Sequence, residues 1–187
     1  MQVNKIFNRT IFITGLTASG KSTLGKRLND QLINYGIDNV KFLDGEDLRM
    51  SIKKLGKEYG YSNYDREKMC LKTASIALEY NRNGYICIIS SICHVKKTRE
   101  KMNKIIGIGD VLEVFLNCPV SICAKRDYKN HYVKAFQGDY DNFIGVTEPY
   151  QESNNIPLIL YTGKDSMDKC SRKLFDVSLS FLQKKHK

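Results

Sequence analysis

Short apolar runs alternate with amphipathic segments along most of this chain of 187 residues. The runs are rich in β-branched residues and have the length of buried strands. They lie at Thr10–Thr14, Asn39–Asp44, Tyr85–Ser90, Val111–Asn117 and Pro157–Thr162. Strands separated by helices predict an α/β fold in which a parallel β-sheet is flanked by helices, because parallel neighbours need a crossover connection.

The segments between the runs carry apolar residues at helical spacing. The first helix should begin near Lys21 and end near Tyr35, with Gly36 as its stop and an apolar face made of Leu24, Leu28, Leu32 and Ile33. A long helix is predicted over Asp65–Gly84, with Ile76 and Tyr80 on its apolar side. Further helices are expected from Lys96 to about Lys104, from Ser121 and over Ser166–Lys185.

The carboxyl ends of parallel strands lie at one edge of a sheet, and ligands of such folds bind there. The loops that begin near Gly15, Asp44, Ser90 and Asn117 should therefore share this edge. We expect the motifs in these loops to form one site.

The loop after the first predicted strand reads Gly15-Leu16-Thr17-Ala18-Ser19-Gly20-Lys21-Ser22 and is followed by Thr23. This spacing fits the phosphate-binding P-loop, in which glycines let successive backbone N–H groups point inward and the next helix adds its positive end. Lys21 is predicted to bridge the β- and γ-phosphates of ATP, and Ser22 to hold Mg²⁺.

The second predicted strand ends in Leu43–Arg49, which reads LDGEDLR. Asp44 should face the γ-phosphate, where a carboxylate can orient an acceptor hydroxyl, accept its proton or bind a metal-bound water. Arg49 could hold an anionic acceptor. The alternative is that Asp44 or Asp47 caps the following helix.

A second polar stretch, Gly60–Glu67, contains two tyrosines and an Asp-Arg pair. An aromatic ring here could stack on a base, and Arg66 could bind a phosphate or sulfate. Capping of a helix by Ser62 or Asp65 would explain part of the same pattern.

The segment from Arg126 to Tyr150 is polar, aromatic and basic, and its length predicts a lid that excludes water from the reaction. A simple surface excursion is the alternative. Cys93-His94 invites a nucleophile–base interpretation, but no third group orients the pair and the P-loop already explains the chemistry. His131 is expected to be a polar lid residue.

Composition adds limits to this interpretation. With 42% hydrophobic and 27% charged residues, the chain is expected to form one globular domain, residues 1–187. No run approaches the roughly 18 apolar residues of a membrane span, and the first residues lack a secretion signal, so we expect a cytoplasmic protein that does not bind membranes. None of the six cysteines forms a C-x-x-C pair, and free thiols are expected, several of them packing as small apolar groups.

The formal net charge is +10, which raises the question of nucleic-acid binding. The basic residues are scattered, and only the tail QKKHK is a run, which fits a solvated helix end. We therefore expect a small-molecule nucleotide as partner and no nucleic acid.

Together the segments GLTASGKST, LDGEDLR, GYSNYDRE, RDYKNHYVKA and FIGVTEPY, with the late strand, resemble the adenylylsulfate kinase family. The resemblance runs from about Thr10 to Thr162. It implies a P-loop nucleotide-kinase fold with a lid, commonly a homodimer. It also implies transfer of phosphate from MgATP to the ribose 3′-hydroxyl of adenosine 5′-phosphosulfate, a reaction of sulfate assimilation.

The resemblance also implies roles for single residues. Lys21 and Ser22 would serve ATP and Mg²⁺, and Asp44 would align the acceptor hydroxyl. Arg126 would lie near the ATP base. The acceptor nucleotide would contact Asp44 and a further set of residues, namely Arg49, Tyr61, Arg66, Ile92, Lys129 and Phe143.

The chain departs from the family pattern mainly in the acceptor half. Glu46 replaces the second Asp of D-G-D, and Met69 stands where the family has an Asn that touches the acceptor. Other departures are Ile92-Cys93-His94 for Ile-Ser-Pro, Asn130-His131 for Gly-Leu, Phe136 for an Arg and Phe143-Ile144-Gly145 for F-T-G. Polar contacts discriminate strongly between substrates, so another activated nucleotide such as cytidine diphosphoramidate is the alternative acceptor. We favour adenylylsulfate; a P-loop binding module without transfer activity and a nucleic-acid-binding protein are the rival classes.

Overall fold

A computed structural model of the protein describes residues 5–56 and 58–184. Within these residues one sheet of five parallel strands has the order β2-β3-β1-β4-β5. The strands are β1 (Thr10–Gly15), β2 (Val40–Asp44), β3 (Ile86–Ser90), β4 (Val111–Leu116) and β5 (Leu158–Leu160). The predicted α/β fold with a parallel sheet is thereby confirmed. The end of the basic tail, 185–187, lies outside the described residues.

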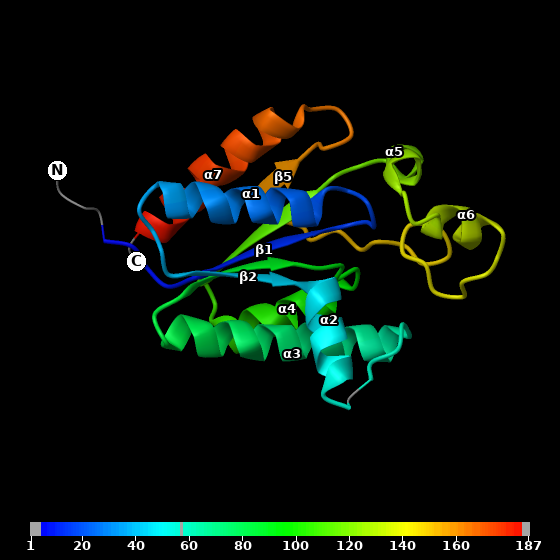
Figure 1. The fold of residues 1–187 in the computed structure, drawn as a ribbon, viewed down its shortest axis with the longest axis horizontal. Helices are drawn as coiled ribbons and strands as arrows, with labels where there is room; N and C mark the ends of the chain where they lie inside the picture. Colours follow the sequence, from blue (N-terminus) through cyan, green and yellow to red (C-terminus); the bar gives the residue numbers. More distant parts are fainter. Residues whose placement is uncertain (1–4, 57, 185–187) are drawn as a thin grey trace.

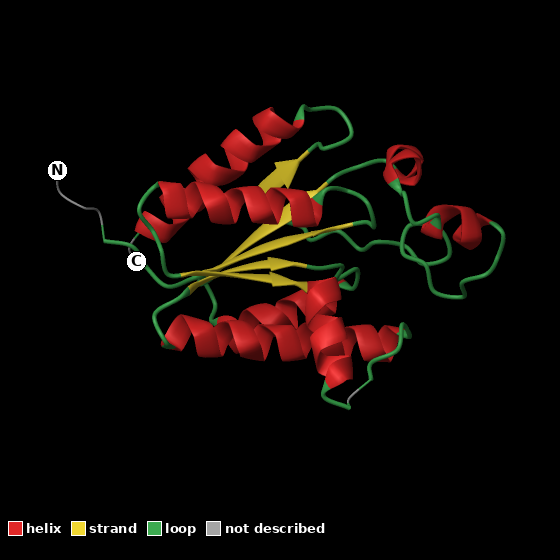
Figure 2. Ribbon diagram, in the orientation of Figure 1, coloured by secondary structure: helices red, strands yellow, loops and turns green. Residues whose placement is uncertain are grey.

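Helices cover both faces of the sheet (Figures 1 and 2). They are α1 (Lys21–Asn34), α2 (Gly45–Lys54), α3 (Asn63–Arg82), α4 (Lys96–Ile106), α5 (Val120–Arg126), α6 (His131–Phe136) and α7 (Met167–Gln183). In Figure 1, α1 and α7 pack on one face and α3 and α4 on the other, while α5 and α6 project beyond the carboxyl ends of the strands. The residues that the sequence predicts to form a lid therefore stand at the edge where ligands of this architecture bind.

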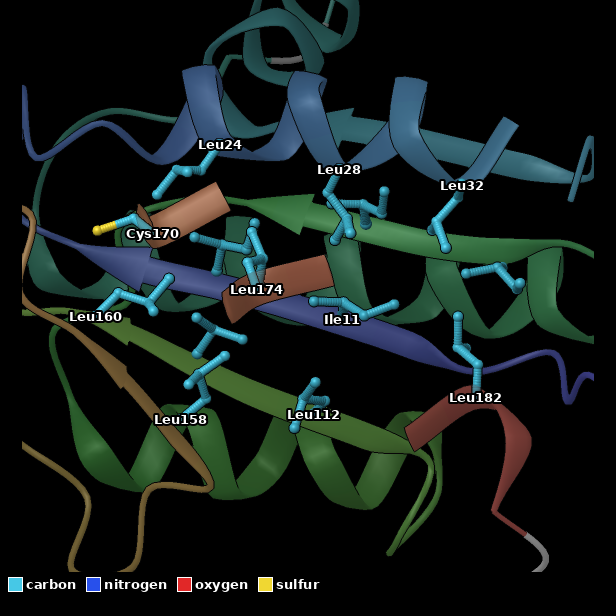
Figure 3. Close-up of a cluster of buried hydrophobic side chains, with 14 of the residues drawn as sticks. Ile11, Leu24, Leu28, Leu32, Leu112, Leu158, Leu160, Cys170, Leu174 and Leu182 are labelled. Atoms are coloured by element: carbon cyan, nitrogen blue, oxygen red, sulfur yellow. The ribbon is translucent and has the colours of Figure 1, made fainter. Parts of the chain in front are cut away.

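The core beneath α1 and α7 is aliphatic (Figure 3). Leu24, Leu28 and Leu32 project from α1 toward β3 and β1 and are fully buried, which gives the helix the predicted apolar stripe. Ile33 was expected on the same stripe but is 41% exposed. It follows Leu32 by one residue, about 100° around the helix, and this rotation carries it away from the sheet.

Small side chains bring α3 close to the other face of the sheet. The buried side of this helix is made of Met69, Cys70, Thr73, Ala74 and Ala77. Tyr80 is partly buried and packs against this core as predicted, whereas the predicted Ile76, also partly buried, is not among the residues that pack against it. The face is polar and sulfur-containing near the amino end of α3, which lies toward the site.

The six cysteines are free thiols, as predicted, and all six are buried. Among the described residues, none of the helices has both the length and the apolar character needed to cross a membrane.

A buried arginine connects the chain that leaves the predicted lid to the loop after β3. Arg99 is 1% exposed and pairs with Glu113, with 3.1 Å between Nε and Oε1. Its other nitrogens donate to the carbonyls of Cys93, at 2.6 Å, and of Gln151. The guanidinium also lies 5.1 Å from the ring centre of Tyr150. This network fixes both loops against the sheet below the site.

Candidate active site

The loop between β1 and α1 has the backbone of a tight anion-binding turn. Gly15, Ala18 and Gly20 have φ angles of 151°, 57° and 98°. At Gly15 a Cβ atom would lie 2.8 Å from the carbonyl oxygen of Leu116, so a side chain does not fit. Ala18 adopts the left-handed region without being glycine, a conformation that costs about 1 kcal/mol or more and persists only where neighbours enforce it.

Lys21 is held within this loop. It is buried, and its Nζ donates a hydrogen bond to the carbonyl of Leu16 at 2.6 Å. Burial lowers the pKa of Lys21 from 10.5 to about 8, while the Asp44 carboxylate acts in the opposite direction. An ammonium kept in a poorly solvated position gains strongly from an anionic ligand, which suits a phosphate contact.

Asp44 joins the P-loop to the second strand. Its Oδ2 accepts a hydrogen bond from the Ser22 hydroxyl at 2.6 Å, and its Oδ1 accepts one from the backbone N–H of Glu46 at 3.0 Å. Asp44 is thus the N-cap of α2, as the alternative interpretation held. It also lies beside the P-loop, where the active-site interpretation places it, so its capping of α2 is compatible with that interpretation.

A third oxygen stands near this pair. The Ser90 hydroxyl, 2% exposed at the end of β3, lies 3.5 Å from the Ser22 hydroxyl. Within the described residues, no three His, Cys, Asp or Glu side chains gather as a metal site. Mg²⁺ in kinases is held by one or two protein oxygens together with phosphates and waters, so the hydroxyl and carboxylate oxygens here fit that ion.

Arg49 and Arg66 flank one tyrosine ring. The guanidinium carbons lie 4.7 and 5.3 Å from the ring centre of Tyr61. Arg49 donates to the carbonyls of Tyr59 and Gly60, at 2.6 and 2.7 Å. Burial, followed by the proximity of Arg49, lowers the pKa of Arg66. The positive charges of the two neighbouring guanidinium groups repel each other, and an anion bound between them would relieve this repulsion.

The lid segment, 126–150, touches the rest of the site at several points. Lys129 pairs with Glu46 on α2, with 2.5 Å between Nζ and Oε1. Arg66 on α3 donates to the carbonyl of Asn142 at 3.0 Å. Glu46, one of the departures from the family pattern, therefore has a partner on the lid segment.

Phe143 belongs to an aromatic cluster within this segment. Its ring is stacked with that of Tyr140 at 5.8 Å and meets the ring of Tyr132 edge-on at 4.9 Å. Tyr61, the other ring predicted to stack on a base, is 64% exposed. Both line the same hollow, which leaves aromatic faces available near the two arginines.

Arg126, predicted to lie near the ATP base, ends α5. Its guanidinium donates to the carbonyl of Thr162 at 2.8 Å and contacts the sulfur of Cys118 at 3.7 Å. These contacts hold the side chain on the P-loop side of the site.

A cavity of about 930 Å³ runs between the P-loop, α2, α3 and the lid segment. This volume is at the upper end of the range for small-molecule sites. Three of the predicted site residues, Gly15, Leu16 and Ser19, do not line the cavity. The others line the cavity: Thr17, Ala18, Gly20, Lys21, Ser22, Thr23, Asp44, Arg49, Tyr61, Arg66, Ile92, Arg126, Lys129 and Phe143.

Two residues at the site were missed in the sequence. Ser90 was used only to mark a strand end, although its position at the carboxyl end of a strand next to β1 was a usable signal. Tyr132 was quoted only within a motif, and its hydroxyl donates to the Thr17 carbonyl of the P-loop at 3.1 Å. No spacing rule links a residue in a long loop to a carbonyl 115 positions earlier.

The environment of Cys93 and His94 gives no support to covalent catalysis. A hydrogen bond with Cys70 and burial hold the pKa of the Cys93 thiol well above its usual value. Burial and the nearby Arg66 lower the pKa of His94. A thiol that stays protonated is a poor nucleophile.

The parallel sheet, the phosphate-binding turn before α1 and the acid at the end of β2 define a P-loop nucleotide kinase fold. Residues 8–161 match the model of the adenylylsulphate kinase family. The chain belongs to this family.

Individual relatives agree with this assignment. The adenylyl-sulfate kinase of Clostridium kluyveri is 34% identical over 166 residues, which cover 89% of this chain and 81% of the relative. That of Bacteroides thetaiotaomicron is 34% identical over 94% of this chain and 85% of its own length. Among solved structures, the Mycobacterium tuberculosis APS kinase in complex with AMPPNP and APS has a TM-score of 0.83 at 29% identity. That match covers 94% of this chain and 99% of the solved one.

Proposed function

We propose that this protein is an adenylylsulfate kinase, which transfers the γ-phosphoryl group of ATP to the 3′-hydroxyl of adenosine 5′-phosphosulfate. The observation that carries the proposal is the hydrogen bond between Ser22 and Asp44, which brings a P-loop hydroxyl and a strand-end acid together beside Lys21. Family membership supplies the reaction type and the acceptor.

In this mechanism the backbone amides of Gly15–Thr23 and the Lys21 ammonium bind the β- and γ-phosphates. Ser22, next to Asp44, would hold Mg²⁺, which neutralises charge on the transferred group. Asp44 keeps a free lone pair on each oxygen beyond its two hydrogen bonds, so it can orient the acceptor hydroxyl and take its proton. Catalysis rests on positioning and charge neutralisation.

The acceptor would lie between α2, α3 and the lid segment. Arg49 and Arg66 would bind its anionic groups, and Tyr61 and Phe143 would stack on its base. Ile92 and Lys129 would complete the contacts, and Arg126 would lie near the base of ATP. We expect the enzyme to work in the cytoplasm, where reducing conditions keep its cysteines as thiols. A homodimer remains our expectation from the family.

The test is an acceptor panel with MgATP, read by mass spectrometry for a product heavier by one phosphate. Adenosine 5′-phosphosulfate should give that product, and Lys21→Ala should abolish it while the folded state remains. Phosphorylation of a cytidine diphosphoramidate instead would move the assignment to another activated nucleotide. ATP binding without ADP release for any acceptor would support a binding module.

A further inference from the structure

One buried side chain of the lid segment touches both halves of the site. Tyr132, on α6, is 1% exposed although its helix projects beyond the sheet (Figure 1). Its hydroxyl donates to the carbonyl of Thr17 in the P-loop at 3.1 Å. Its ring meets the ring of Phe143 edge-on, with centroids 4.9 Å apart and an angle of 77° between the planes.

The hydrogen bond controls how one P-loop peptide is oriented. The Thr17–Ala18 peptide is trans and planar, so its C=O and N–H point in opposite directions. Because the Thr17 carbonyl accepts the hydrogen bond from Tyr132, the N–H of Ala18 points away from Tyr132. Ala18 has a φ of 57°, a conformation that needs support from its surroundings. Burial raises the pKa of the Tyr132 phenol and keeps it a donor.

Close packing connects Tyr132 to the segment that carries Phe143. Tyr132, Leu16 and Ile144 belong to one buried cluster. At Gly145, with a φ of 96°, a Cβ atom would lie 3.0 Å from the Leu16 side chain, so the Gly145 backbone packs closely against that side chain. The N–H of Tyr132 also donates to Asp127 at 2.7 Å, which fixes the start of α6. A dense cluster of this kind changes as a unit rather than side chain by side chain.

From these contacts we propose that Tyr132 is a positioning residue that couples the ATP-binding loop to the acceptor half of the site through Phe143. Phosphates that bind the P-loop favour the peptide orientation that the Tyr132 hydroxyl recognises, and Tyr132 then holds Phe143 in place. Thermodynamic reciprocity requires that an acceptor bound against Phe143 strengthens ATP binding by the same factor. The proposal rests on the proposed function, which assigns ATP to the P-loop and the acceptor to Phe143.

Hydrogen exchange tests the coupling without an acceptor. The full chain is compared with and without AMPPNP and Mg²⁺, and exchange is followed in residues 139–148. We expect the nucleotide to slow exchange there, and Tyr132→Phe to reduce this protection by about three- to tenfold, the effect of one buried hydrogen bond. Tyr128→Phe, which alters a lid tyrosine that is 85% exposed, should keep the protection. Undiminished protection in Tyr132→Phe, or none in the parent, overturns the proposal.

Binding measurements give the second readout. Calorimetry gives the dissociation constant of adenosine 5′-phosphosulfate with and without AMPPNP, and the ratio is the coupling factor. Tyr132→Phe should lower this factor about three- to tenfold while each ligand alone binds within about twofold of the parent. If Tyr132→Phe loses affinity for AMPPNP but keeps the coupling factor, Tyr132 only supports the P-loop, and the proposal is overturned. If the parent binds no adenosine 5′-phosphosulfate, the proposed function fails, while the exchange experiment still decides the role of Tyr132.

Discussion

The Ser22 hydroxyl donates to the Asp44 carboxylate over 2.6 Å, although Ser22 follows β1 and Asp44 ends β2, and these two strands are not neighbours in the sheet. The same carboxylate caps α2 through the N–H of Glu46. One acid thus fixes the start of a helix and faces the phosphate-binding loop. Substitution can therefore separate its contribution to helix capping from the catalytic contribution that we propose.

Asp44→Asn should separate them, because asparagine caps a helix about as well as aspartate. We expect turnover to fall by roughly 10²- to 10⁴-fold, the contribution of a general base, while ATP affinity changes little. The free energy of unfolding should stay within about 0.5 kcal/mol of the parent. Asp44→Ala also loses the helix cap, and its free energy of unfolding should therefore be lower by about 1 kcal/mol. Equal turnover in the parent and Asp44→Asn would reduce Asp44 to a helix cap.

Lys21 should destabilise the nucleotide-free protein, since its pKa is about 8 in the folded state and 10.5 in the unfolded state. The folded state then binds fewer protons between these values, so the contribution of Lys21 to stability rises with pH over this window. Below pH 8 the cost of burying the charge is fully present, and at 1.36 kcal/mol per pKa unit it reaches about 3 kcal/mol.

Lys21→Met should therefore raise the free energy of unfolding at pH 7 by about 1–3 kcal/mol, part of the gain being offset by the lost hydrogen bond to Leu16. The gain should shrink as the pH rises from 8 to 10.5. Urea unfolding without nucleotide at several pH values measures it, with the exposed Lys26→Met on the same helix as control. If the difference in free energy of unfolding between Lys21→Met and the parent does not vary with pH, burial does not lower the pKa of Lys21.

The ion pair between Glu46 and Lys129 should make a small contribution to holding the lid segment. Both side chains are partly exposed, and such pairs contribute less than about 1 kcal/mol. Glu46→Gln should raise the KM for the acceptor about two- to fivefold and should add nothing when Lys129 is already Gln. The effect should fade at high salt. Additive effects of the two substitutions would show that the residues act separately.

Arg99 should be essential to stability. Arg99→Met leaves the buried carboxylate of Glu113 without its ion-pair partner and should lower the free energy of unfolding in urea by about 3–5 kcal/mol. Arg99→Met combined with Glu113→Gln should recover part of that loss, because the unpaired charge is gone. If the double variant loses as much free energy of unfolding as the two single variants together, the two residues are not a coupled pair.

Much of the fold could be predicted because its determinants are local. The β-branched runs, the leucines at helical spacing and Gly36 predicted β1, α1 and the turn after it. Errors arose where a face is set by packing, as at Ile33, whose exposure depends on how α1 is rotated against the sheet. The small helix α6 was also not predicted, since its N-cap Asn130 has a φ of 57°, which the sequence did not indicate.

The sequence by itself determined the phosphate-binding turn and the succession of the five strands and the longer helices along the chain, because both depend on residues close together in the chain. Only the tertiary structure decided that Asp44 meets Ser22, that Lys129 meets Glu46 and that Tyr132 reaches the carbonyl of Thr17. These pairs are 22, 83 and 115 residues apart. Such contacts exist because the sheet brings distant loops to one edge, and no local periodicity encodes which side chains meet there.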